Sequence, residues 1–186
     1  MRLYTLALLA STVAVGACDK GPSVDLKNAS PADVAKAMKD SGATRAMVRP
    51  GKWASTVSIA EMDTSTLPPE LAAKINAEIG KPRTVEACLT PEEVDHPERM
   101  LAQVPATCRY EYYKMSGGNI DGKLRCTGPA GNQEMTVQGT YGKDRYSMLI
   151  GNKSSASVGS PVLAGPSSKM KVESHRIGDC DGKPAS

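Results

Sequence analysis

The five cysteines constrain this chain more than any other feature, because they decide which segments are tied together. They are Cys18, Cys88, Cys108, Cys126 and Cys180. If Cys18 has a separate use, four cysteines remain, and an even set suits disulfide formation in an oxidising compartment. Their spacings contain no C-x-x-C unit of the kind that marks a zinc site. The sequence therefore predicts two structural disulfides among Cys88, Cys108, Cys126 and Cys180.

Four cysteines allow three pairings, and the residues alone leave more than one open. We favour Cys88 with Cys108, which closes a local loop, and Cys126 with Cys180, which ties the carboxyl terminus to the sheet. The main alternative joins Cys108 to Cys126 across a hairpin. In the chain-entropy model, each favoured disulfide would contribute about 3 to 4 kcal/mol of stability.

The amino-terminal segment supplies the separate use for Cys18. Arg2 precedes an uncharged apolar run from Leu3 to Val15, the length of a secretory h-region. A transmembrane helix would need about 20 apolar residues. The run ends in Val15-Gly16-Ala17-Cys18, which resembles the bacterial lipobox, where the cysteine receives a diacylglycerol. We predict a lipoprotein signal peptide over residues 1–17 and lipidation of Cys18; the alternative is an ordinary secretory peptide cut near Ala17.

Lipidation of Cys18 predicts a location. Two or more acyl chains hold a protein stably in a membrane, so we expect the chain to be anchored in the cell envelope and to face the periplasm. Asp19 resembles a residue that retains lipoproteins in the inner membrane of some Gram-negative bacteria, which slightly favours that membrane. The net charge of +3 is small and the charges alternate in sign, so no nucleic-acid partner is expected.

The remaining residues, about 170, suit a single domain with a sizeable core. We divide them into a lipidated tether over 18–29, a helical segment over 30–47, a disulfide-stapled β-domain over 48–181 and a tail over 182–186. The helical segment opens with Ser30-Pro31-Ala32-Asp33, in which serine, proline and aspartate occupy the positions that favour a helix start.

Two further helices are expected inside the β-domain. Pro68-Pro69 opens a helix that closes at Gly80, and Leu71, Ile75 and Ile79 recur in it at intervals of four residues. That spacing predicts a stripe facing the core. The second capping pattern, Thr90-Pro91-Glu92-Glu93, predicts a short helical turn that ends at His96-Pro97.

Strands account for most of the rest. Lys52 to Ile59 alternates in a two-residue period around Trp53, and after Cys108 turn residues at hairpin spacing separate five more candidate strands. Those five are Cys108–Met115, Lys123–Thr127, Gln133–Tyr141, Arg145 to about Val158, and Ser168–Arg176. Met135 and Met170 lie on apolar sides opposite polar ones, which predicts one buried face. We therefore predict a mainly β (α+β) fold: a curved antiparallel meander of about six strands with one or two helices packed on it.

Several landmarks resemble a known family. They are Pro50-Gly51-Lys52-Trp53, Cys88-Leu89-Thr90-Pro91-Glu92, Cys108, Cys126-Thr127-Gly128, and His175-Arg176-Ile177-Gly178-Asp179-Cys180. Over about residues 48–180 they resemble family 3617 of bacterial domains of unknown function. Its members are typically small exported proteins, often with a signal peptide or lipobox. Many have Glu after the tryptophan, where this chain has Ala54. No activity is assigned to the family, so the resemblance implies no catalytic residue.

Signals for catalysis, metals and cofactors are weak. The two histidines, His96 and His175, are not surrounded by a G-x-S-x-G, H-E-x-x-H or phosphate-loop motif. Methionines are scattered one per strand, which favours core packing over a Cu(I) site. We predict no catalytic residues, no metal ligands and no cofactor.

The leading hypothesis is a noncatalytic envelope lipoprotein that serves as a binding or structural module at the membrane surface. Its expected partners are the membrane, through the acyl chains, and an envelope protein or a small apolar ligand. One alternative is a carrier of a small apolar ligand or lipid in a pocket of the curved sheet. Its expected ligand-facing residues are Trp53, Tyr110, Tyr112, Met135 and Tyr146. The last alternative is an uncharacterised enzyme or a copper-binding protein.

Overall fold

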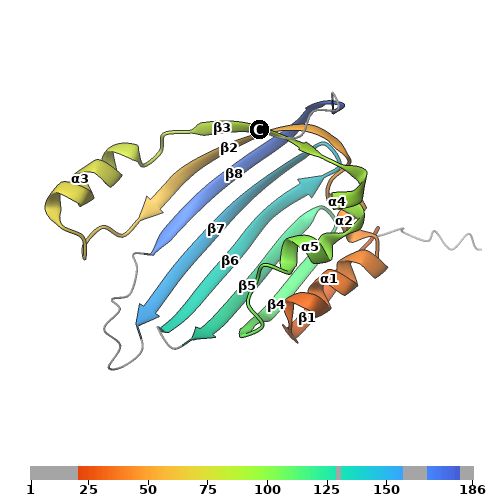
Figure 1. Cartoon of the computed structure of the whole chain (residues 1–186), viewed down its shortest axis with the longest axis horizontal. Coiled ribbons are helices and arrows are strands. Elements are labelled where there is room, and N and C mark those ends of the chain that lie inside the picture. Colours follow the sequence, from red (N-terminus) through yellow and green to blue (C-terminus); the bar gives the residue numbers. More distant parts are fainter. Residues whose placement is uncertain (1–20, 129–130, 157–166, 181–186) are drawn as a thin grey trace, which may run out of the picture.

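The computed structural model describes residues 21–128, 131–156 and 167–180 (Figure 1). The predicted signal peptide, Cys18, Asp19 and the tail over 182–186 lie outside these residues. Across the described ranges the chain forms eight strands and five helices. None of these helices has both the length and the apolar character needed to cross a membrane.

The strands form one antiparallel sheet, which confirms the predicted fold class. They are β1 (Val24–Ala29), β2 (Gly51–Met62), β3 (Arg83–Leu89), β4 (Cys108–Ser116), β5 (Asn119–Gly128), β6 (Gly131–Gly142), β7 (Arg145–Ala156) and β8 (Ser168–Gly178). Their order is β1-β4-β5-β6-β7-β8-β2-β3, so β4 to β8 are the predicted meander of consecutive hairpins. The β2–β3 hairpin extends the sheet at β8, and β1 extends it at β4.

Two strands in this sheet are additional to the six expected. The prediction of a tether over 18–29 is wrong for residues 24–29, because β1 pairs with β4 from Val24 opposite Met115 to Ala29 opposite Tyr110. Similarly, β3 pairs with β2 from Gly51 opposite Leu89 to Val57 opposite Arg83. β1 has six residues and β3 has seven, so the apolar alternation in each is too brief to mark a strand in the sequence.

Three helices begin where the sequence predicts a start, at Pro31, Pro69 and Pro91, whereas the two short helices that begin at Ala43 and Pro97 have no side-chain cap and are not predicted. The helices are α1 (Pro31–Asp40), α2 (Ala43–Met47), α3 (Pro69–Glu78), α4 (Pro91–Asp95) and α5 (Pro97–Leu101). The backbone N–H of Asp33 donates to Ser30 Oγ at 3.1 Å, and the N–H of Glu93 donates to Thr90 Oγ1 at 3.2 Å. Each bond satisfies a donor that the first turn of a helix leaves without an intrahelical partner.

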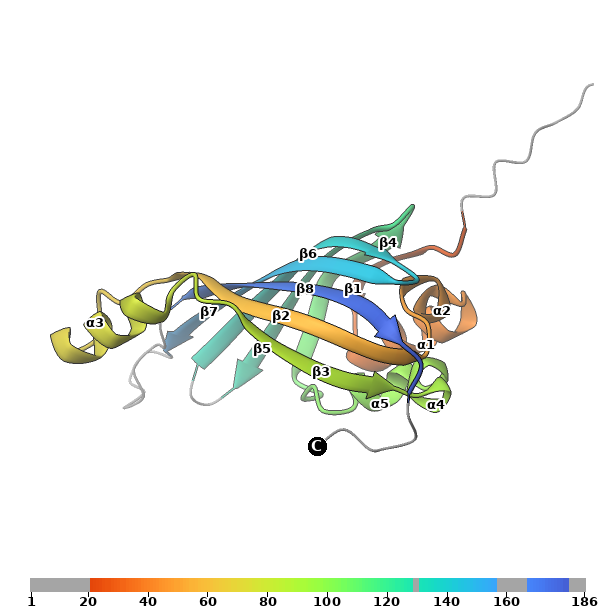
Figure 2. The ribbon, with the colours of Figure 1, turned by 90° about the horizontal axis from the view of Figure 1, so that it is seen from above.

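The hydrophobic core lies under the helices at one side of the sheet. Figures 1 and 2 show α1, α2, α4 and α5 gathered beside β1, β4 and β5, while α3 projects from the opposite end. Val34 and Met38 of α1 pack there against Met115, which is fully buried. The hydroxyl of Tyr113 lies within hydrogen-bonding distance of two sulfurs, 3.4 Å from Met38 Sδ and 3.0 Å from Met115 Sδ.

α3 departs from its prediction. Its existence is confirmed, but the expected core-facing stripe is wrong, since no residue of α3 is buried and Leu71 is 45% exposed. The reason is its position: α3 lies past the end of β2, where the sheet no longer offers a face to cover (Figure 1). Only Ile75 and Ile79 of the stripe are half-buried.

The two disulfides join Cys88 to Cys180 and Cys108 to Cys126. The favoured pairing is therefore wrong, and the alternative across the hairpin is confirmed. Cys108 and Cys126 lie directly opposite each other in the β4–β5 pair. Cys88 lies near the end of β3 and Cys180 lies just after β8. The disulfide between them therefore joins the two strands that flank β2.

Candidate functional site

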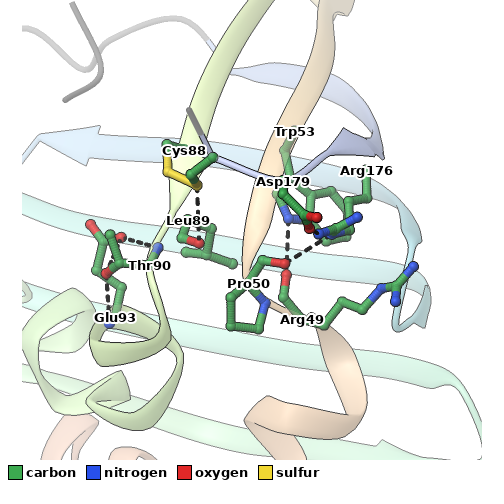
Figure 3. The surroundings of a disulfide bond; sticks show 10 residues. Arg49, Pro50, Trp53, Cys88, Leu89, Thr90, Glu93, Arg176 and Asp179 are labelled. Atoms are coloured by element: carbon green, nitrogen blue, oxygen red, sulfur yellow. Dashed lines mark hydrogen bonds and ion pairs between the residues drawn. A yellow bond between two sulfur atoms is a disulfide. The ribbon is translucent and has the colours of Figure 1, made fainter. Parts of the chain in front are cut away.

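Several of the landmark motifs meet at one corner of the sheet, where β2 begins and β8 ends (Figure 3). Arg176 Nε donates to the carbonyl oxygen of Pro50 at 2.8 Å, and the same guanidinium forms an ion pair with Asp179. The indole N–H of Trp53 donates to the carbonyl oxygen of Arg49 at 3.1 Å. The side chains of the corner thus bind the backbone around the start of β2.

The disulfide completes this corner. Figure 3 shows Cys88 beside Leu89 and the capping residues of α4, and the Sγ of Cys180 lies 3.9 Å from the carbonyl oxygen of Leu89. The corner thus fastens β2, β3 and β8 to one another through their ends. Its polar groups bind one another, so the arrangement suits stability rather than recognition of a ligand.

The five expected ligand-facing residues do not surround one cavity. Tyr110 is buried in the core under the helices, and Trp53 is buried with its ring centroid 5.7 Å from that of Tyr146. Tyr112 pairs with Lys123, which places it on the opposite, polar face of the sheet. Met135 lies on the same face as Tyr110 but is 45% exposed. The structure therefore does not place these five side chains around a common cavity.

Beyond the helices, the same sheet face continues as an apolar surface that no helix covers. We call it the open face; the strand registers place on it Val57, Ile59, Val85, Met135, Ile150, Met170 and Val172. Val85 is 58% exposed and Met170 is 37% exposed, while Val57, Ile150 and Val172 are half-buried. The prediction that Met135 and Met170 are buried is wrong, because the helical layer ends before it reaches them.

A cleft adjoins the open face at α3. It has a volume of about 450 Å³ and lies between α3 and the adjacent parts of β2 and β3. Its apolar wall consists of Val57, Ile59 and Met62 from β2 and Ile75 from α3. The backbone N–H of Gly80 donates to the carbonyl oxygen of Ile59 at 2.8 Å and so fastens the end of the α3 segment to β2.

Positive charge surrounds this α3 cleft. Lys74, Lys81 and Arg83 line it, and Glu78 is the one carboxylate among its lining residues. Glu78 binds Lys81 Nζ at 2.9 Å and Arg83 Nη2 at 3.3 Å. The hydrogen bonds from Lys81 and then Arg83 hold the pKa of Glu78 below its usual value, so it is ionised at neutral pH. Three cations therefore face one carboxylate.

Sequence reasoning missed this cleft, although basic residues flank the apolar stripe of α3.

The titratable residues weighed for catalysis lie apart. His96 Nδ1 lies 2.6 Å from Glu98 Oε1 where α4 meets α5. His175 is exposed on β8 opposite Arg145. In the part of the chain that the structure describes, no three His, Cys, Asp or Glu side chains group closely enough to hold a metal ion.

Comparison with known proteins gives one match. A family model described as "Protein of unknown function (DUF3617)" matches residues 48–180. No curated protein and no solved structure matches the chain. The matched segment contains the corner, the open face and the α3 cleft, whereas β1 and α1 precede it.

Proposed function

This chain belongs to the DUF3617 family of proteins of unknown function, and from that premise we propose a role for it as a noncatalytic binding module of the cell envelope. In this proposal Cys18 carries the lipid anchor, and the open face binds a small apolar ligand or lipid. The observation that carries the proposal is that one part of an apolar sheet face lies uncovered while another part holds the core.

An uncovered apolar face of this kind supports binding. Contiguous apolar patches on monomeric proteins tend to be small, and the larger ones mark binding sites. Here Met135 and Met170 project from neighbouring parts of one face, and methionine side chains adapt their shape to varied apolar partners. The opposite face carries ion pairs such as Lys123 with Glu111 and Glu134, so the two faces differ in chemistry.

The positions of the histidines support a noncatalytic role. General-base catalysis needs a base within reach of a nucleophile or substrate in a shared site. His96 is paired with Glu98 beside the helices, and His175 projects from the polar face. Neither lines the α3 cleft or belongs to the open face.

A binding measurement tests the proposal. Residues 18–186 with Cys18→Ser retain every described residue and avoid the anchor, so binding of the neutral fluorescent probe N-phenyl-1-naphthylamine can be titrated without a membrane. We expect the double variant Met135→Asn and Met170→Asn to weaken probe binding at least tenfold. Both residues are exposed, so the fold should persist.

Leu149 offers a matched control. It is also apolar and 39% exposed, but it pairs with Lys171 on the polar face. Leu149→Asn should leave probe binding unchanged. Absence of binding to the unsubstituted chain, or equal loss in Leu149→Asn, would contradict the open face as the binding surface.

A further inference from the structure

We propose that the α3 cleft binds the anionic head of a single-chain amphiphile, such as a fatty-acid carboxylate, whose tail lies along the open face. This inference rests on the proposed function and adds to it the chemical class of the ligand and the place of its head. The observation behind it is the juxtaposition of an apolar wall with an excess of cations in one cleft.

The charges select an anion. Glu78 is shared between Lys81 and Arg83, so one carboxylate pairs with two cations and leaves one positive charge in excess. Lys74 adds a third positive charge from α3, and in the described part of the chain it forms no ion pair. A carboxylate that enters the cleft would lower the net charge of these four side chains from +2 to +1. It would also accept hydrogen bonds from ammonium or guanidinium groups, and such charge-assisted bonds are among the stronger ones.

The apolar wall favours a ligand that has a hydrocarbon tail attached to its anionic head. Val57 and Ile59 belong both to the cleft and to the open face, so a tail that leaves the cleft meets apolar surface without crossing a polar strip. Met170 pairs with Ile59, and Val172 pairs with Val57, which continues the path across β8. The cleft volume of about 450 Å³ lies within the roughly 300 to 1,000 Å³ of small-molecule sites.

The position of the cleft favours a free amphiphile over a membrane surface. The described chain begins at Gly21, at the end of the molecule opposite α3 (Figure 2). An anchor on Cys18, three residues earlier, would therefore attach the membrane at that end. The α3 cleft would then point away from the bilayer, toward ligands that are dissolved or delivered by another protein.

Calorimetric titration of residues 18–186 with Cys18→Ser tests the inference, with decanoate, decyltrimethylammonium and 1-decanol as probes of equal chain length. We expect decanoate to bind at least tenfold more tightly than decyltrimethylammonium. Shortening decanoate to octanoate should weaken binding by up to about fourfold per methylene removed, the value for full burial. Acetate should show no measurable binding.

Substitutions in the α3 cleft then test where the anionic head group binds. Lys74→Gln with Arg83→Gln should weaken decanoate binding at least tenfold and leave 1-decanol binding unchanged. The matched control, Lys36→Gln with Lys114→Gln, also removes two exposed cations, but from α1 and β4 at the other end of the sheet. It should leave the binding of both probes unchanged. Circular dichroism checks that each variant keeps the fold.

The outcomes separate the two proposals. If decanoate and 1-decanol bind equally, and only the Met135 and Met170 substitutions weaken them, the cleft assignment is overturned and the proposed function stands. If decyltrimethylammonium binds as tightly as decanoate, the anionic class is overturned. If no probe binds, both proposals fail. Selective loss of decanoate binding in the Lys74 and Arg83 variant would support the inference.

Discussion

The guanidinium of Arg176 occupies the space that a β-carbon on Gly51 would need. Such an atom would lie 2.3 Å from Arg176 Nε, and Gly51 has a φ of 143°, a backbone conformation that favours glycine. The guanidinium is held by its hydrogen bond to Pro50 and its ion pair with Asp179. The start of β2 and the end of β8 are thus fitted to each other across 125 residues of sequence.

Gly51→Ala should therefore destabilise the fold. The substitution imposes a strained φ and displaces Arg176 from Pro50, and we expect a loss of about 1 to 3 kcal/mol in the free energy of unfolding. Urea denaturation measures it. Gly178→Ala is the control, because Gly178 has no atom within 4 Å of the added methyl and no positive φ. Equal destabilisation by both variants would count against the fit.

The burial of Tyr113 predicts that the free energy of unfolding falls at alkaline pH. Burial raises the pKa of its hydroxyl above the usual value near 10. The unfolded chain therefore releases this proton at a lower pH than the folded chain, so stability falls as the pH rises above about 10. Denaturant titrations at pH 8 to 11 should show a smaller decline in Tyr113→Phe than in the unsubstituted chain.

The same variant tests the sulfur contacts. At neutral pH, Tyr113→Phe removes the hydroxyl's contacts with Met38 and Met115, and we expect a cost of about 0.5 to 1.5 kcal/mol. Tyr112→Phe, on the polar face, is the comparison. An identical alkaline decline in unsubstituted and Tyr113→Phe chains would show that the hydroxyl is not buried in solution.

The disulfide pairing can be checked by mass spectrometry of a proteolytic digest under nonreducing conditions. Linked peptides should contain Cys88 with Cys180 and Cys108 with Cys126. The sequence separations are 92 and 18, so in the chain-entropy model removing the first bond costs about 4.5 kcal/mol and removing the second about 3 kcal/mol. Paired serine substitutions measure these values, and a peptide joining Cys88 to Cys108 in the natively folded protein would contradict the fold.

The proposed lipid anchor predicts that labelled palmitate is incorporated at Cys18. Cys18→Ala removes the thiol that would carry the diacylglycerol, so the full chain should no longer incorporate labelled palmitate. Cys88→Ala with Cys180→Ala is the control, because it alters two cysteines without touching the lipobox. Labelling that persists in Cys18→Ala would show that another residue is lipidated.

The sequence predicts those parts of the fold that depend on local chemistry. The β6–β7 hairpin follows from the turn residues Gly142-Lys143-Asp144, and α1 follows from the cap at Ser30. In each case the residues that determine the structure are neighbours in the chain. Each strand of the meander from β4 to β8 can therefore be predicted from the sequence, before any tertiary contact is known.

What the sequence did not predict depends on contacts between distant segments. Met135 alternates like a core residue, but its burial depends on how far α1 and α2 extend over the sheet. β1 has only a brief apolar pattern and becomes a strand by pairing with β4. The α3 cleft arises because α3, a helix with an apolar stripe, is placed past the end of the sheet.

The two disulfides are nested, since the bond between Cys108 and Cys126 lies wholly inside the loop closed by Cys88 and Cys180. A chain that crosses a membrane amino terminus first would deliver Cys88 and Cys108 before either native partner. The first two cysteines to be delivered are thus not native partners, and a bond between them would have to break before Cys126 could pair with Cys108. The outer bond must wait for nearly the last residue to arrive. If the chain is exported in this way, native pairing requires thiol–disulfide exchange, and in a strain without an enzyme that catalyses this exchange, misoxidised chains with the Cys88–Cys108 bond should accumulate.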